Sequence, residues 1–379
     1  MRYSFLIFLG AFITLTLSSQ ELPPAIYVGG QSQHVQGIAL DREAGYMYMS
    51  FTNRFIKADL QGNIVASIDR IQGHLGAMCF NPENRMVYAS LECKDDEIGA
   101  GIAKALGTET VSRSGCVFYI AIIDVDKLTE VGVDPEGSDV LRTVCVKEAG
   151  ADYKAVVAID GKEYEHKYGC SGIDGVTIAP PVGKPGGKNM LYVAYGVYSD
   201  VQRTDNDYQV LLCYDLGKLN RYAETITFGT VPENGPSKPK AKYFVRTGNT
   251  NWGVQNLSYD SYTGNVFMAV YRGKKAEWPN YYLYAFPLDQ KPTKGVLVGT
   301  GYDSTKHPLL SLAAEGLLDE ATGVRGWNFK WGSTGLCPLG NGMWYISENA
   351  RDKQTGLESC TARLYRWSGE PARAFVPVE

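Results

Sequence analysis

Two of the four histidines occupy equivalent positions in two similar segments of the chain. His34 opens a segment that ends at Asp41. His74 opens one that ends at Asn81, and the two histidines align when these ends are superposed. Imidazole is the side chain best suited to proton transfer near neutral pH. We therefore predict that both histidines are catalytic, although a hydrogen bond that caps a strand turn explains the same positions.

Oxygen-bearing side chains at four positions predict a calcium site. Calcium takes about six to eight oxygen ligands, mostly carboxylates and carbonyls. Asp174 stands in an apolar segment, where an acid needs partners, and we predict a catalytic or ligand role for it. The alternatives are that this acid ties neighbouring repeats together, and that the charged run at 92–97 is a solvated loop. The predicted metal ligands are Glu92, Asp174, Asn256 and Glu348.

Basic and aromatic side chains in other loops predict a substrate site for an anion. Arg272, Lys274 and Arg351 could hold a carboxylate or a phosphate. Trp252 could stack on a sugar ring, and Tyr198 lies in a loop that we expect on the same face of the molecule as Trp252. A basic surface turn around Arg272 and a core role for the tryptophan are the plainer alternatives.

A pattern of short strands recurs along the chain and must position these residues. The first unit has strands at 34–41, 45–52, 54–60 and 64–68, and related units begin at residues 74, 173, 254 and 334. Each unit has the form of one four-stranded antiparallel blade, which buries its faces only against neighbouring blades. The pattern therefore predicts an all-β fold, a β-propeller, rather than a sandwich.

The number of blades follows less directly from the sequence. Five units are visible, but they are unevenly spaced, and a blade usually takes about 40–50 residues. We predict five blades, with six as the alternative if another lies within 145–168 or 300–330. Residues 25–28 and 374–378 are then expected to meet and close the ring.

The predicted site residues fall on one face of such a propeller. The segments that enter the innermost strands and the loops after the second strands surround the same mouth of the central channel. The expected long loop insertions are 93–115, 196–208, 300–330 and 349–361. Because function concentrates in loops on a rigid scaffold, we expect a ligand site at this mouth.

The first 19 residues read as a secretory signal peptide. A positive residue near the start is followed by an apolar run at 6–17 and then by small and polar residues. The run is short for a membrane anchor, which is the alternative, and no later stretch reaches the roughly 20 apolar residues of a membrane span. We expect residues 20–379 to form a single domain that is secreted or periplasmic.

Composition narrows the class of protein further. Lys and Arg number 37 against 41 Asp and Glu, so the chain has no basic excess for binding nucleic acid. The eight cysteines suggest disulfides in an exported protein, with Cys93 and Cys116 as the first choice, and others as buried thiols. We expect a monomer.

The blade pattern resembles the exported propellers of the gluconolactonase, strictosidine-synthase and NHL type. The resemblance covers nearly the whole of the expected mature chain, at the level of the superfamily. A gluconolactonase-like propeller would imply a central divalent cation held by acidic and amide side chains.

Three classes of function stay open at this point. The first is an enzyme: a metal-assisted hydrolase of esters, lactones or phosphoesters, or a lyase that eliminates from an anionic sugar. The second is a binding propeller that holds a glycan or a protein without turnover. The third is a purely structural propeller with a plugged channel. Convergence of His34, His74, Asp174, Glu92 and Glu348 on one pocket would favour the enzyme.

Overall fold

The computed structural model describes residues 21–108, 115, 117–229 and 232–379. The signal peptide expected at 1–19 and the cysteine at position 116 lie outside the described residues. No helix in the described part of the chain is long and apolar enough to cross a membrane.

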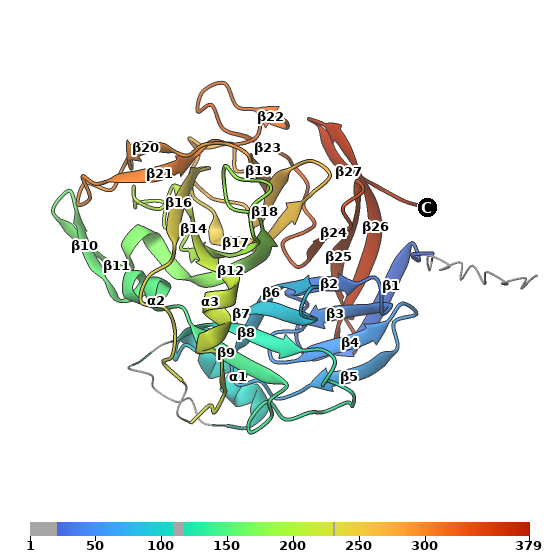
Figure 1. Cartoon of the computed structure of the whole chain (residues 1–379). Coiled ribbons are helices and arrows are strands. Elements are labelled where there is room, and N and C mark those ends of the chain that lie inside the picture. The colour runs from blue at the N-terminus through green and yellow to red at the C-terminus, as the bar shows by residue number, and fades with distance from the viewer. Residues whose placement is uncertain (1–20, 109–114, 116, 230–231) are drawn as a thin grey trace, which may run out of the picture.

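Five blades are arranged in a ring, as Figure 1 shows. The innermost strands are β2 (Gly37–Asp41), β6 (His74–Asn81), β12 (Cys170–Ala179), β17 (Asn251–Asp260) and β24 (Leu336–Pro338). Each innermost strand contacts the next, and β24 contacts β2, so the ring is closed. The predicted five-bladed β-propeller is confirmed.

Blades 1 and 2 come from the N-terminal half of the chain. Blade 1 continues outwards with β3 (Tyr46–Ser50), β4 (Phe55–Asp59) and β5 (Ile64–Ile68). Blade 2 continues with β7 (Met86–Glu92), β8 (Phe118–Asp124) and β9 (Leu141–Cys145), to which β15 (Glu224–Thr225) adds an edge. The helix α1 (Glu97–Leu106) lies between β7 and β8.

Blades 3 and 4 carry additions at their outer edges. Blade 3 continues with β13 (Met190–Val197), β14 (Tyr208–Asp215) and β16 (Ala241–Arg246), then β21 (Lys306–Leu310) and β20 (Thr293–Val296). Blade 4 continues with β18 (Asn265–Tyr271) and β19 (Leu283–Pro287). Its outer position is held by Trp327, whose backbone exchanges hydrogen bonds with that of Leu283.

Both ends of the chain complete blade 5. It contains β24, β25 (Met343–Arg351) and β26 (Glu358–Glu370), with β1 (Ala25–Gln31) and β27 (Arg373–Pro377) outside. The strand β1 pairs with the first half of β26, and β27 pairs with the second half. They meet at Leu364, which donates to Pro24 O at 2.8 Å and accepts from Val378 N at 2.9 Å. The expected closure of the ring by 25–28 and 374–378 therefore takes place on a shared neighbour.

The two regions that could have held a sixth blade form appendages instead. Residues 145–168 contain α2 (Lys147–Lys154) and a hairpin of β10 (Val156–Ile159) and β11 (Lys162–Glu165). Residues 300–330 contribute β21 to blade 3 and a small hairpin of β22 (Leu317–Leu318) and β23 (Arg325–Gly326). The remaining helices are short: α3 (Leu216–Leu219) and two 3₁₀ turns, Lys167–Gly169 and Asn220–Tyr222.

Residues 349–361, expected as a loop insertion, are mostly strand. The hairpin β25–β26 stays paired from Arg351 and Glu358 inwards. The Asp352 carboxylate accepts from the backbone of Gln354 and Thr355, which closes the turn between them.

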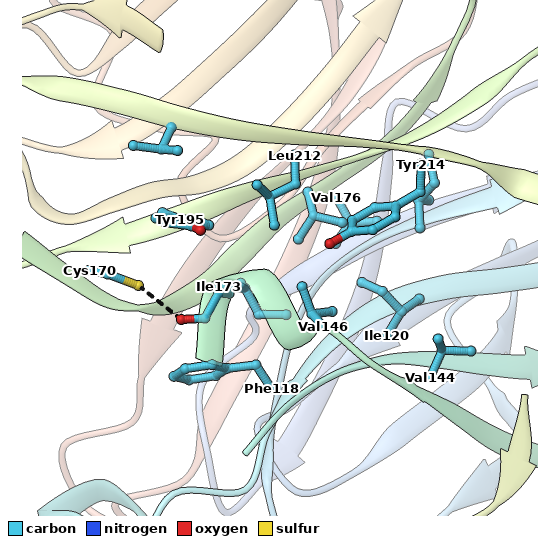
Figure 2. Close-up of a cluster of buried hydrophobic side chains, with 14 of the residues drawn as sticks. Phe118, Ile120, Val144, Val146, Cys170, Ile173, Val176, Tyr195, Leu212 and Tyr214 are labelled. Carbon is cyan, nitrogen blue, oxygen red and sulfur yellow. Dashed lines mark hydrogen bonds between the residues drawn. The ribbon is translucent and has the colours of Figure 1, made fainter. Parts of the chain in front are cut away.

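The apolar core lies between neighbouring blades. Figure 2 shows the cluster between blades 2 and 3, where Phe118 and Ile120 face Ile173 and Tyr195. The strand β8 is apolar at Phe118–Ile123 without alternation, because both of its faces are covered by another blade. The thiols of Cys79, Cys170, Cys213, Cys337 and Cys360 are not in disulfides and lie within the blades.

Candidate functional site

A cavity of about 260 Å³ lies at one mouth of the channel. Its lining comes from blades 1 to 4 and from Ile98 of α1. It includes five of the residues predicted from the sequence: His34, His74, Glu92, Asp174 and Trp252. The topology brings these residues together, because each lies just before or within an innermost strand, except Glu92, which ends a second strand.

Asp174 reaches the cavity because β12 is irregular at this point. The register of β12 against β13 shifts between Ile173 and Val176, and such a bulge re-aims side chains. The carboxylate also needs Gly76 of the neighbouring blade, because a Cβ there would lie 2.2 Å from Asp174 Oδ1. The backbone N–H of Ala77 donates to the same oxygen at 3.4 Å.

The pKa of Asp174 is raised well above its usual value, first by burial and then by the charge of Glu92. A carboxyl group in this setting holds its proton at a pH where an exposed aspartate has lost it. Asp174 can therefore carry a proton at the cavity wall.

Glu92, the last residue of β7, is fixed on both of its oxygens. Its Oε1 accepts from the backbone N–H of Ile173 at 2.8 Å, and its Oε2 lies 3.1 Å from Lys94 Nζ. Gly172 leaves the room for this carboxylate, because a Cβ there would lie 1.7 Å from Oε1. Glu92 thus links the second strand of blade 2 to the innermost strand of blade 3.

Lys94 has all three of its donors engaged. Besides Glu92, its ammonium contacts Asp96 Oδ2 at 3.0 Å and Ser171 O at 3.0 Å. Only 4% of its side chain is exposed. Burial alone would lower the pKa of Lys94, but the two carboxylates outweigh burial and raise it. Lys94 therefore stays charged and has no donor left for a ligand.

The two histidines differ in their surroundings. The Nε2 of His34 lies 2.9 Å from Gln36 Nε2, which is an amide donor, so this nitrogen accepts and the proton sits on Nδ1. The ring of His74 interacts with its own backbone through a hydrogen bond. Burial, followed by the charge of Lys94, lowers the pKa of His74 to about 4, and burial also lowers the pKa of His34. Both rings are neutral at neutral pH.

Aromatic rings form one side of the mouth. Trp252 is 39% exposed, and Tyr198 packs against it edge to face with the ring centroids 5.7 Å apart. The backbone of Trp252 has φ +67°, a region that non-glycine residues rarely adopt. Such strained positions cluster at functional sites, and Gln255 Nε2 stabilises this one by donating to Trp252 O at 2.9 Å.

Six predicted residues do not line the cavity: Tyr198, Asn256, Arg272, Lys274, Glu348 and Arg351. Glu348 is engaged within blade 5, by Arg363 Nε at 2.9 Å and the Tyr365 hydroxyl at 2.6 Å. Arg272 and Lys274 are exposed in the loop after β18, and Arg351 is exposed on the β25–β26 hairpin.

Asn256 lies within the ring rather than in the cavity. Its Nδ2 donates to Gln36 O at 3.0 Å and to Ser333 O at 2.9 Å, so it ties three innermost segments together. The sequence analysis gave no role to five polar residues of the lining, which are Gln36, Lys94, Ser171, Gln255 and Tyr271. Their positions, in segments that enter innermost strands or in loops after second strands, were the signal that could have found them.

The oxygen donors do not fit the calcium site expected from the sequence. Of the four expected ligands, Glu92 and Asp174 line the cavity, whereas Asn256 and Glu348 are engaged elsewhere. In the described part of the chain, no three His, Cys, Asp or Glu side chains are grouped so that they could hold a metal ion. The ammonium of Lys94 lies among the oxygens of Glu92, Asp96 and Ser171.

The strand pairing and the cavity define a closed five-bladed β-propeller with a pocket at the channel mouth. No protein-family model matches the chain, and no curated protein matches it.

Several solved structures are similar to the chain, at low identity. A gluconolactonase from Xanthomonas campestris is 9% identical, over 93% of this chain and 79% of that one, with a TM-score of 0.35. A hydrazine synthase from Kuenenia stuttgartiensis is 12% identical, over 89% and 77% of the two chains, with a TM-score of 0.35. A computationally designed protein, Ika4, is 11% identical, over 71% and 98%, with a TM-score of 0.24. The propeller class rests on the strand pairing and not on these similarities.

Proposed function

We propose that the protein is a hydrolase that cleaves a small ester or lactone in the cavity at the channel mouth. One observation carries the proposal: a neutral histidine, His74, and a carboxyl group with a raised pKa, Asp174, line the same cavity. Pairs of titratable groups whose surroundings push their pKa values apart are typical of acid–base catalysis.

In this proposal His74 is the general base and Asp174 the general acid. His74 takes a proton from a water molecule as that water attacks the carbonyl carbon. The C–O bond to the leaving oxygen then breaks, and Asp174 donates its proton to that oxygen. The proton on His74 returns to Asp174 through solvent, so the balance is ester plus water to acid plus alcohol. The Nδ1–H of His34 is a neutral donor suited to the developing oxyanion.

The charges around the cavity favour a neutral carbonyl substrate over a phosphoester or an anionic sugar. An anion would need a free cation, and the donors of Lys94 are all engaged. The sugar-lyase version of the function relies on Arg272 and Lys274, which are exposed outside the lining. The aromatic side formed by Trp252 suits the apolar face of a sugar-derived or other cyclic ester.

The test is turnover of a panel of aryl esters, γ-lactones and δ-lactones by the protein and three variants. His74→Gln and Asp174→Asn are expected to lower kcat/KM by about 10²–10⁴-fold. The matched control is His307→Gln, since His307 hydrogen-bonds Asp303 in the outer part of blade 3, and its activity should stay within about twofold. Equal activity of wild type and His74→Gln would overturn the proposal.

The same assay decides between the proposal and its rivals. Activity that EDTA abolishes and calcium restores would replace it with the metal-assisted version. Ligand retention without turnover would replace it with a binding propeller for a glycan or a protein. Export after removal of residues 1–19, to the periplasm or the medium, and a monomeric state are part of the proposal and are read from cell fractionation and light scattering.

A further inference from the structure

Lys94 and its neighbours have the composition of a cation site. Two carboxylates, from Glu92 and Asp96, and one backbone carbonyl, from Ser171, converge on a single point. Carboxylate and carbonyl oxygens are the ligands that hard divalent cations prefer. The point where they converge is occupied by the ammonium of Lys94, with only 4% of that side chain exposed.

We propose that Lys94 is a built-in cation, whose ammonium fills an oxygen cage that would otherwise bind a divalent metal ion. The three contacts of 3.0–3.1 Å are normal for an ammonium. A calcium ion needs the same oxygens at about 2.3–2.6 Å and cannot share the cage with another positive charge. This inference rests on the geometry around Nζ and not on the proposed reaction.

The surrounding fold also fixes the positions of the two carboxylates of the cage. Glu92 is held by the backbone of Ile173, and Asp96 caps α1 by accepting from Gly99 N at 3.0 Å. The oxygens therefore stay close together when the ammonium is removed. Two carboxylates held close together without a counter-charge repel each other, and a divalent cation from solution would neutralise both.

The experiment replaces Lys94 with a neutral side chain of similar length and uses Mn²⁺ as the probe. Lys94→Met is expected to bind one Mn²⁺ with a Kd of about 10⁻⁴ M, by calorimetry and by loss of the free-ion paramagnetic resonance signal. Wild type is expected to bind at least about tenfold more weakly. The midpoint of thermal unfolding of the variant should rise by about 2–5 °C at 100 times the Kd.

Two further variants locate the site. Lys275→Met is the matched control, because Lys275 is equally buried but contacts only one carboxylate, Asp207, and the amide of Asn206. It should gain no Mn²⁺ site. Adding Glu92→Gln to Lys94→Met should abolish the gained binding, because it removes one of the two carboxylates.

Three results would overturn the inference. The first is a folded Lys94→Met that binds no Mn²⁺ more tightly than wild type does. The second is a wild type that binds Mn²⁺ as tightly as the variant and loses it with Glu92→Gln. The third applies if Lys94→Met unfolds in metal-free buffer, and it is failure to refold in about 10 mM Mn²⁺ or Ca²⁺. All three readouts are independent of turnover, so they separate this inference from the proposed hydrolase.

Discussion

Asn256→Ala should destabilise the ring without touching the cavity. The amide of Asn256 donates to Gln36 O at 3.0 Å and to Ser333 O at 2.9 Å, and its side chain is buried. Alanine leaves two buried carbonyl groups without these partners, and each such loss costs about 1–3 kcal/mol. The two losses are not fully additive, because the structure around the missing amide adjusts once for both carbonyl groups. We therefore expect the free energy of unfolding to fall by about 2–4 kcal/mol.

The loss converts into a measurable shift of the unfolding midpoint. A chain of 379 residues gains roughly 0.8 kcal/mol/K of entropy on unfolding, so the midpoint should fall by about 3–5 °C. Thermal and urea unfolding measure it, with Asn63→Ala as the matched control. Asn63 is exposed and bonds within its own turn, so its replacement should cost about 0.5 kcal/mol or less.

Calcium distinguishes this structural role from the ligand role expected from the sequence. The loss for Asn256→Ala should be the same with and without millimolar calcium. A wild type stabilised by calcium, and a variant that has lost that effect, would refute the reasoning. So would a loss no larger than that of Asn63→Ala.

Three other outcomes are expected. Gly76→Ala should lower activity at least about tenfold, because its Cβ would lie 2.2 Å from Asp174 Oδ1, whereas Gly150→Ala, with nothing within 4 Å, should not. His74 binds its proton less readily in the folded chain, with a pKa of about 4 against 6.5. The unfolded chain then holds more protons between these values, so this contribution to stability is complete above pH 6.5 and falls by up to about 3 kcal/mol towards pH 4. Urea unfolding against pH, compared with His74→Gln, tests this, and equal profiles would contradict it. Burial raises the pKa of Cys337 to about 12, so this thiol should react slowly with a thiol reagent at pH 8 until the protein unfolds, and rapid native labelling of Cys337, located by mass spectrometry, would contradict that.

The fold could be predicted because the blade repeats in the sequence. Short strands and tight turns recur with apolar first strands, and neighbouring blades bury both faces of each sheet, as the unbroken run at Phe118–Ile123 shows. The boundaries of β25 and β26 were harder to predict. The polar residues at 349–361 resemble a loop, but their backbone pairs across the hairpin whatever their side chains are.

The site could be predicted only in part, because topology places a residue but does not aim its side chain. His34, His74, Glu92, Asp174 and Trp252 share a cavity, as their positions on one face required. Asn256 and Glu348 occupy comparable positions along their strands but turn to partners inside the ring and within blade 5. Those choices depend on contacts between blades, which a single sequence does not specify.

The same topology bears on how the chain becomes this protein. The strand β1, near the start of the chain, finds its partner only in β26, near the end. The two strands are far apart in the sequence, since Ala25 pairs with Arg363, so this contact must wait until β26 has been synthesised. Until then β1 and the edge of blade 5 expose unpaired backbone, which is the surface on which chains aggregate. Before ring closure, a chaperone or another copy of the chain could therefore bind these unpaired strands.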